Sequence, residues 1–310
     1  MKRLKRWSIG LLVVLGTALL LLWRSHAWLA ITERSGGRVL VVEGWMDEPQ
    51  LEQAAVIFRD GGYERVYTTG TVRPFAYYLV PGARLSLGPT ERAFRSVEVS
   101  VAGLPACTVL VVMNGDTVLR APTGDRITNH GIDLRGPAYS LVIACDPIYP
   151  QPGPPSVFIH ALRLDGKNAH DLQAPLTIFN PDSVLLPGTP TYAESAAAFL
   201  ALHGVPADRI TAVPAGGDPV SRSWANAATL GHHLGGMGIT ALDVVTLGVH
   251  ARRSRALYRE ALGEKVAVGV ISLPDPGCPA DGWWKSEKGW YTLLKEIAGS
   301  QEAVVVDATR

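Results

Sequence analysis

The feature that most constrains the fold is a change in the pattern of predicted strands and helices along the chain. Two blocks that alternate strands with helices are separated by residues 74–175, which show strand-like segments alone. In the first block, the continuous apolar run Val39–Val42 predicts a strand buried on both faces. A helix with an apolar stripe along Leu51–Phe58 follows, and Val66–Thr68 predicts the next strand. Two strands joined by a helix form a βαβ unit, which favours a parallel sheet.

The second block resumes this alternation after residue 175. It contains apolar strand-like runs at Ser183–Leu186, Ile210–Val213, Val244–Leu247 and Val266–Ile271. The helix after the first of these runs opens with the capping box Thr191-x-x-Glu194. Residues 28–73 and 176–310 are therefore predicted to form one α/β domain with a mostly parallel sheet and helices between the strands.

Residues 74–175 are predicted to form a separate all-β domain inserted into the α/β domain. Short apolar segments alternate there with Gly, Pro, Asn and Asp, and Ser96–Val101 alternates strictly between polar and apolar residues. Such alternation is typical of an antiparallel strand with one buried face. We expect a β-sandwich or jelly roll.

The N-terminal residues 1–27 are predicted to form a single transmembrane helix. Four basic residues precede Trp7–Trp23, which contains no charge. By the positive-inside rule the N-terminus stays in the cytoplasm, so we expect a protein of the cell inner membrane with most of its chain in the periplasm. A cleaved signal peptide ending near Ser25–Ala27 is the alternative.

Composition narrows the classes of partner. The chain has 29 Lys and Arg against 28 Asp and Glu, a net charge of +1 that argues against nucleic-acid binding. Its cysteines, Cys107, Cys145 and Cys278, fit no metal-binding spacing. Cys107 and Cys145 either pair in an oxidising compartment or are small buried hydrophobic residues. We expect no metal and no cofactor.

Polar residues and glycines gather where the predicted parallel strands end. Ligands of open parallel sheets bind at this edge. The set comprises Glu43, Gly44, Thr69, Gly70, Thr189, Glu194, Arg222, Ser223, Asn226, His250 and Arg253. Glu194 is also explained by its helix cap.

Within this set, His250 and Asn226 are the candidate catalytic residues, and the others are candidate ligand-binding residues. Arginine side chains hold phosphate or carboxylate groups, and histidine exchanges protons near neutral pH. Arg252, Arg253 and Arg255 crowd the start of a predicted helix over Ala251–Leu262, where the helix dipole favours an anion. A solvated basic face is the alternative reading. No Ser-His-Asp order or Walker-type loop is present.

Several motifs together resemble the YdcF/SanA/ElyC-like family. The matching stretches are Val39–Trp45, Thr68–Gly70, Glu194 with Gly204–Pro206, Ser221–Ala227 and Thr246–Ser254. The resemblance implies a Rossmann-like sheet with helices on both faces and a role in cell-envelope metabolism, without a settled reaction. This chain has Ala225 where the family usually carries an acidic residue.

The insertion resembles the small xylan-binding type of carbohydrate module, in strands such as Tyr139–Cys145 and Val157–Gly166. Such modules tend to hold calcium and sugar hydroxyls through acidic loop residues, and Asp146 sits in a suitable loop. The following segment, Tyr149–Ser156, has no carboxylate, so we expect no calcium site.

The sequence thus predicts a membrane-anchored protein of envelope biogenesis whose α/β domain binds, and possibly turns over, a phosphorylated or otherwise anionic envelope precursor. The alternative is a non-catalytic glycan-binding or scaffold protein that acts through the β-sandwich. Nucleotide or methyl-donor binding is a third reading, and the lack of G-x-G-x-x-G after the first strand argues against it.

Overall fold

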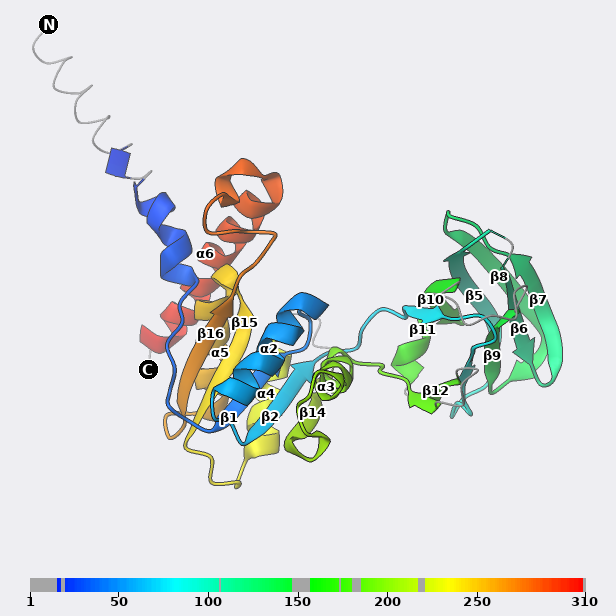
Figure 1. The fold of residues 1–310 in the computed structure, drawn as a ribbon, viewed down its shortest axis with the longest axis horizontal. Helices are drawn as coiled ribbons and strands as arrows, with labels where there is room; N and C mark the ends of the chain where they lie inside the picture. Colours follow the sequence, from blue (N-terminus) through cyan, green and yellow to red (C-terminus); the bar gives the residue numbers. More distant parts are fainter. Residues whose placement is uncertain are drawn as a thin grey trace, which may run out of the picture. The chain divides into compact units, whose positions relative to one another are not determined.

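The computed structural model describes residues 16–17, 20–105, 107–146, 157–172, 174–179, 185–216 and 221–308. The chain divides into two compact units (Figure 1). The first unit comprises Met1–Thr71 and Tyr192–Arg310, and the second comprises Val72–Thr191. The backbone N–H of Tyr192 donates to the carbonyl of Thr71 at 3.0 Å, so the first unit closes on itself where the second begins and ends.

A five-stranded parallel sheet forms the centre of the first unit. Its order is β14-β2-β1-β15-β16. The strands are β1 (Val39–Glu43), β2 (Arg65–Gly70), β14 (Ile210–Pro214), β15 (Ala241–Leu247) and β16 (Ala267–Leu273). From β1 the chain continues to β2 and β14 on one side, whereas β15 and β16 lie on the other. The carboxyl ends of β1 and β15 therefore flank the point where strand order reverses, at which open α/β sheets bind ligands.

Helices cover both faces of this sheet because successive residues of its central strands are apolar. Leu40 and Val42 face α2 (Glu48–Asp60) and α3 (Tyr192–Leu202). Val41 and Val244 face α4 (Arg222–Leu234) and α5 (Ala251–Leu262). The helix α6 (Glu287–Ala308) packs against α5, and short 3-10 helices lie at Ala207–Arg209, Gly248–His250 and Trp283–Lys285.

The second unit is built from two antiparallel sheets. One has the order β11-β10-β5-β8 with β3 also paired to β10, and the other has the order β13-β12-β4-β9-β6-β7. Strand bounds are β3 Tyr77–Leu79, β4 Arg84–Leu87, β5 Phe94–Gly103, β6 Thr108–Met113, β7 Asp116–Pro122, β8 Thr128–Ala138, β9 Leu141–Asp146, β10 Val157–Leu164, β11 Lys167–Asn168, β12 Leu176–Phe179 and β13 Leu185–Pro187, with a 3-10 helix at Ala169–Leu172. Alternate residues of β5, from Val97 to Val101, are buried in a core shared by both sheets.

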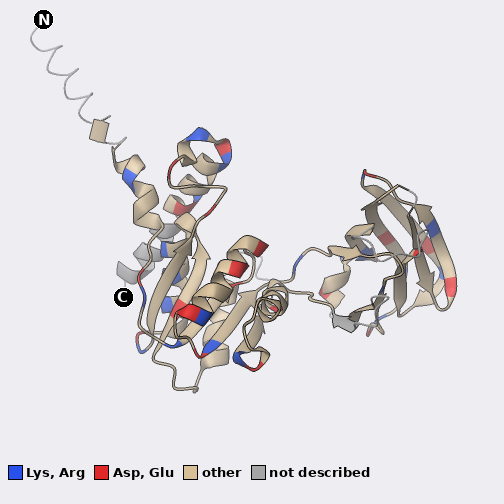
Figure 2. Ribbon diagram, in the orientation of Figure 1, with Lys and Arg blue, Asp and Glu red and all other residues tan. Residues whose placement is uncertain are grey.

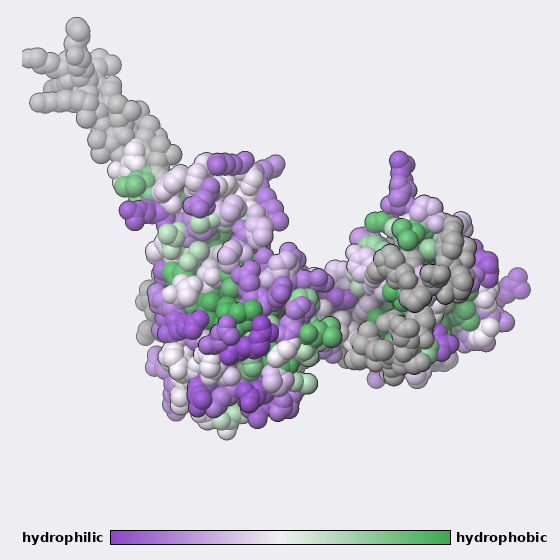
Figure 3. Space-filling model, viewed as in Figure 1, coloured by the Kyte–Doolittle hydropathy of each residue, from purple (hydrophilic) through white to green (hydrophobic). Residues whose placement is uncertain are grey.

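Charge and hydropathy on the viewed surface show no wide patch of one kind. In Figure 2 the acidic and basic residues of each unit are scattered among uncharged ones. In Figure 3 the apolar side chains of the first unit form small groups between hydrophilic ones.

The structure corrects the predicted fold class in two respects, the transmembrane helix and the kinds of sheet. Among the residues with described positions, no helix is both long and apolar enough to cross a membrane. Much of the predicted anchor 1–27 lies outside them, and residues 20–29 are helical, with Leu29 buried against Trp283 and Leu293. The described part of the chain forms three sheets, one parallel and two antiparallel, and Glu33 adds an antiparallel bridge to β16.

The predicted start of the second α/β block is wrong. Residues 176–191 were expected to open that block with a strand at Ser183–Leu186, but they belong to the second unit. Strand β12 pairs with β4, and β13 pairs with β12, so both extend an antiparallel sheet. Apolar runs of this length fit either kind of sheet, and only pairing partners distinguish them. Ser183 and Val184 lie outside the described residues.

Candidate functional site

A pocket of about 440 Å³ lies at the carboxyl edge of the parallel sheet, within the first unit. Its volume falls in the range of small-molecule sites, roughly 300–1,000 Å³. The lining residues come from the loops after β1, β2, β15 and β16 and from helices α3, α4 and α6. They are Trp45, Asp47, Gly70, Thr71, Tyr192, Arg222, Ser223, Asn226, Leu247, Val249, His250, Asp275, Lys288, Tyr291, Thr292, Lys295 and Glu296.

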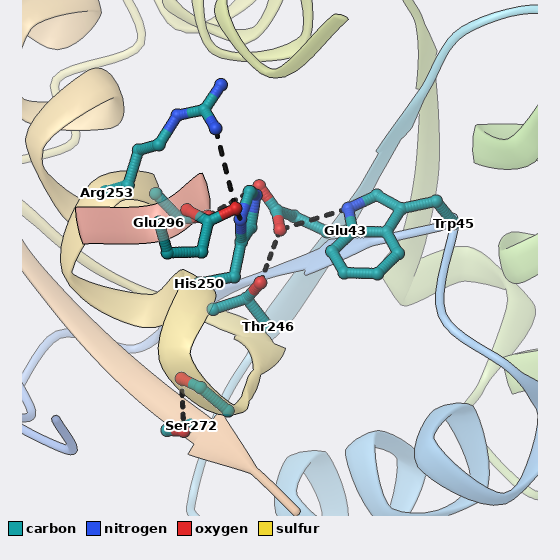
Figure 4. Close-up of polar contacts among 9 residues, drawn as sticks. Glu43, Trp45, Thr246, His250, Arg253, Ser272 and Glu296 are labelled. Atoms are coloured by element: carbon teal, nitrogen blue, oxygen red, sulfur yellow. Dashed lines mark hydrogen bonds and ion pairs between the residues drawn. The ribbon is translucent and has the colours of Figure 1, made fainter. Parts of the chain in front are cut away.

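Glu43, the last residue of β1, is a fully buried carboxylate beneath this pocket. It accepts hydrogen bonds from Thr246 Oγ1 at 2.5 Å and Trp45 Nε1 at 3.2 Å (Figure 4). Ser254 Oγ donates a third hydrogen bond at 3.1 Å. A buried charge needs such partners to offset its lost hydration. Glu43 was predicted as a ligand-binding residue; it is not among the residues that line the pocket, and its carboxylate accepts hydrogen bonds from neighbouring side chains.

His250 ends the short helix that follows β15 and carries a positive charge more readily than an ordinary histidine. Its Nδ1 lies 3.0 Å from Glu296 Oε1, and Trp45 packs edge-on to its ring at a centroid distance of 5.4 Å. Burial would lower the pKa of the imidazole, but the hydrogen bond to Glu296 and the charges of Glu43 and Glu296 outweigh it and raise the pKa. Because Nδ1 is engaged by Glu296, Nε2 is the nitrogen available to a ligand.

Glu296 of α6 completes a buried ionic cluster with His250. It is 3% exposed, and its Oε1 also lies 3.5 Å from Nη1 of Arg253 (Figure 4). Burial would raise the pKa of this carboxyl, but the hydrogen bond with His250 and the charges of His250, Arg253 and Lys295 lower it. The carboxylate therefore fixes the orientation of the imidazole and balances its charge.

The first turns of α4 form another wall of the pocket. Ser221 caps this helix by accepting a hydrogen bond from the N–H of Trp224 at 3.2 Å, and Arg222 and Ser223 line the pocket from its first turn. Asn226, one turn further, is 3% exposed, and its Oδ1 has no hydrogen-bond partner among the described residues. A helix N-terminus next to an arginine favours an anionic group.

Five predicted site residues line the pocket: Gly70, Arg222, Ser223, Asn226 and His250. Gly44 and Thr69 lie in the layer beneath it. A Cβ on Gly44 would collide with the backbone of Tyr192, and Thr69 exchanges a hydrogen bond with Tyr258 at 2.8 Å. Gly44 therefore serves the packing of α3 rather than close approach of a ligand.

Three further predicted ligand-binding residues, Thr189, Glu194 and Arg253, do not line this pocket. Thr189 belongs to the second unit, where its N–H donates to the hydroxyl of Tyr77 at 3.3 Å. Glu194 lies in the first turn of α3 and does not line the pocket. Arg253 acts through its ion pair with Glu296 rather than from the pocket surface.

The other arginines of α5 do not form the anion cluster that their spacing predicts. Arg252 donates from Nε to the carbonyl of Trp28 at 2.7 Å and lies over its indole ring. Arg255 donates to the carbonyl of Val268 at 3.0 Å and pairs with Glu33. These side chains attach the segment before β1 to the sheet, which explains why so many arginines crowd one helix.

Sequence reasoning missed the contribution of α6. Lys288, Tyr291, Thr292 and Lys295 line the pocket together with Glu296. Their spacing of three and four residues places them on one face of a helix, and this signal was readable from the sequence. What could not be read is that this face packs over the end of β15, because no local pattern gives a helix's tertiary partner.

Neither a disulfide nor a metal cluster is part of this site. Cys107, Cys145 and Cys278 are buried thiols, and burial raises the pKa of Cys145 and of Cys278 to about 11. In the ranges whose positions are described, no group of three His, Cys, Asp or Glu side chains could hold a metal ion. In the second unit, Asp146 pairs with Arg120 at 3.3 Å, and the segment 149–156 lies outside the described residues.

Comparisons with known proteins give no family for this chain. No family model matches it, and no curated protein matches it. Among solved structures, the Podospora anserina GH26-CBM35 β-(1,4)-mannanase aligns with 74% of this chain and 63% of its own, at 12% identity and a TM-score of 0.19. DesR, a β-glucosidase from Streptomyces venezuelae solved with D-glucose, aligns over 90% of this chain and 28% of its own, at 12% identity and a TM-score of 0.19. This chain therefore spans less than two thirds of either protein, and similarities this weak carry no argument about its fold or activity.

Proposed function

We propose that the first unit binds a small anionic molecule in its pocket and that His250 exchanges a proton with it through Nε2. The observation that carries the proposal is the buried pair of His250 and Glu296 at the switch point of a parallel sheet. Structural ion pairs also perturb pKa values, but this pair lines a pocket of small-molecule size. A protonated imidazole there combines a positive charge with a transferable proton.

The charge of the pocket lining favours an anion when His250 is protonated. The pocket lining carries three basic side chains, Arg222, Lys288 and Lys295, and three acidic ones, Asp47, Asp275 and Glu296. These charges cancel, so a protonated His250 makes the lining positive. The guanidinium of Arg222 can hold two oxygens of a phosphate or carboxylate at once. The N-terminus of α4 adds its own preference for negative charge.

Proton transfer follows from how the imidazole is held. Glu296 accepts the hydrogen bond at Nδ1, so protonated His250 donates from Nε2 to an oxygen of the ligand, and the neutral form accepts a proton at the same atom. His250 would be the catalytic residue, with Glu43 and Glu296 as positioning residues. The resemblance to the YdcF/SanA/ElyC-like family supports an envelope precursor, phosphorylated or otherwise anionic, as the ligand.

Binding of inorganic phosphate tests the anion site. Arg222→Ala is expected to weaken phosphate affinity by about tenfold or more, because it removes a charge-assisted bidentate contact. Chemical-shift perturbation of the full chain detects binding even at millimolar affinity. Arg65→Ala is the matched control, since Arg65 is exposed at the start of β2, the opposite end of that strand from the pocket. Equal affinities in the two variants, or no phosphate binding in the wild type, would contradict the proposal.

A glycan-binding role of the second unit is the alternative function, and one observation favours it. Tyr78 is 66% exposed and stacks on Phe158 with ring centroids 4.6 Å apart. If this aromatic pair binds polysaccharide, Tyr78→Ser is expected to reduce retention of the chain on insoluble polysaccharides at least about fivefold, as stacked aromatic contacts contribute on the order of 1 kcal/mol. Tyr139→Ser, at a half-exposed tyrosine of the same unit, is the control. Equal retention of both variants would rule this role out.

A further inference from the structure

Two acceptor oxygens of pocket-lining side chains are buried and receive no hydrogen bond from any residue that the structure describes. They are Oδ1 of Asn226 and Oε2 of Glu296, and each residue is only 3% exposed. Buried polar atoms in folded proteins nearly always have hydrogen-bond partners. An unpaired buried acceptor costs folding free energy, so two beside one pocket call for an explanation.

The missing partners are hydrogen-bond donors. Glu296 already receives its hydrogen bond and its ion pair at Oε1, from His250 and Arg253, and neither reaches Oε2. The lysines and Arg222 at the pocket account for an anionic group of the ligand, but a fully deprotonated phosphate or carboxylate cannot donate to a carboxylate or to an amide oxygen. A ligand that satisfies these two oxygens directly therefore carries donors in addition to its charge.

We infer that the ligand is a phosphorylated sugar or polyol whose hydroxyl groups donate to Asn226 Oδ1 and Glu296 Oε2. Hydroxyls fit better than ammonium groups because protonated His250 makes the pocket lining positive, and a positive lining repels a cation. The terminal torsion of an Asn side chain is broad, so rotation about it can turn Oδ1 of Asn226 toward the pocket. Trp45 and Tyr291 supply apolar surface for the carbon face of such a ring.

This inference rests on the proposed anion site, and its test separates the two. Affinities of the full chain are measured by calorimetry for hexose phosphates of gluco, galacto and manno configuration and for cyclohexyl phosphate, which has a ring and a phosphate but no other hydroxyl. At least one hexose phosphate is expected to bind about tenfold or more tightly than cyclohexyl phosphate, the gain of one or two hydrogen bonds to buried acceptors.

Variants then test whether Asn226 recognises the hydroxyl groups of the ligand. Asn226→Leu is expected to remove most of the preference for hexose phosphate over cyclohexyl phosphate, and Asn226→Ala serves as a second variant if the leucine disturbs folding. Thr229→Val, on the same helix but outside the pocket, should retain the preference. If cyclohexyl phosphate binds as well as every hexose phosphate, or if Asn226→Leu keeps the preference, the inference is overturned while the anion site stands. If none of these phosphates binds, both fail.

Discussion

Replacing Glu43 with Ala is expected to lower the free energy of unfolding of the first unit by about 3–5 kcal/mol. The substitution leaves the hydroxyls of Thr246 and Ser254 and the indole N–H of Trp45 without their acceptor. Each buried donor left unpaired costs roughly 1–3 kcal/mol, and the methyl of alanine also leaves a cavity. Loss of the Glu43 charge is also expected to lower the pKa of His250, which that charge helps to raise.

Tryptophan fluorescence during urea unfolding measures this effect in the intact chain. The sequence has eight tryptophans, and none lies in Val72–Thr191, so the signal reports the first unit alone. Glu64→Ala is the control, because Glu64 forms an exposed ion pair with Arg38 and such pairs contribute little. If Glu43→Ala folds too poorly to measure, Glu43→Gln preserves the volume and is expected to show a smaller loss. An unfolding free energy for Glu43→Ala equal to that of the control would show that the buried carboxylate network is not formed.

Glu296→Gln is expected to lower the pKa of His250 and to reduce the free energy of unfolding by about 2 kcal/mol at mildly acidic pH. The carboxylate supplies the hydrogen bond and much of the negative charge that favour the imidazolium. A hydrogen bond between charged groups contributes roughly 1.5–3 kcal/mol. Arg253 also loses its carboxylate partner.

The sign of the pH dependence follows from the raised pKa. A histidine whose folded-state pKa exceeds its unfolded value of about 6.5 adds stability that is complete below that value. This stability is lost as pH rises through the folded-state pKa. The difference in unfolding free energy between wild type and Glu296→Gln should therefore shrink over that window. Glu287→Gln, at an exposed position in the first turn of α6, is the control, and a difference that stays constant across the window would contradict the proposed ion pair.

The strands of the parallel sheet were predictable because they are short and rich in β-branched residues, and the central strands β1 and β15 are buried on both faces. Val39–Val42 and Val244–Leu247 lie in β1 and β15, which place Glu43 against the pocket-lining Trp45 and His250, three residues after Leu247, in the pocket lining. The antiparallel character of the second unit was readable in the alternation of Ser96–Val101. Both features follow from the pattern of apolar and polar residues within a few positions of one another, and such a pattern can be read directly from the sequence.

The predictions that failed concern contacts between residues that lie far apart in the sequence. Glu296 lies 46 residues after His250, and nothing near it signals that their side chains meet. The run at residues 183–186 has the composition of a buried strand, yet the strand there joins an antiparallel sheet through β12. The arginines of α5 suggested an anion, but Arg252 and Arg255 find partners in the segment before β1. Each error concerns which surface an element packs on.

The central claim is that a positively charged His250 lies at an anion-binding pocket, and titration of its imidazole by NMR tests it most directly. The chain has eight histidines, so His250→Gln identifies the signal. Sulfate is the probe because it stays a dianion from about pH 5 to 9 and its own ionisation does not enter. The account predicts a midpoint above the ordinary value of about 6.5, and a further upward shift when sulfate is added. A midpoint at or below that value, unchanged by sulfate, would contradict it.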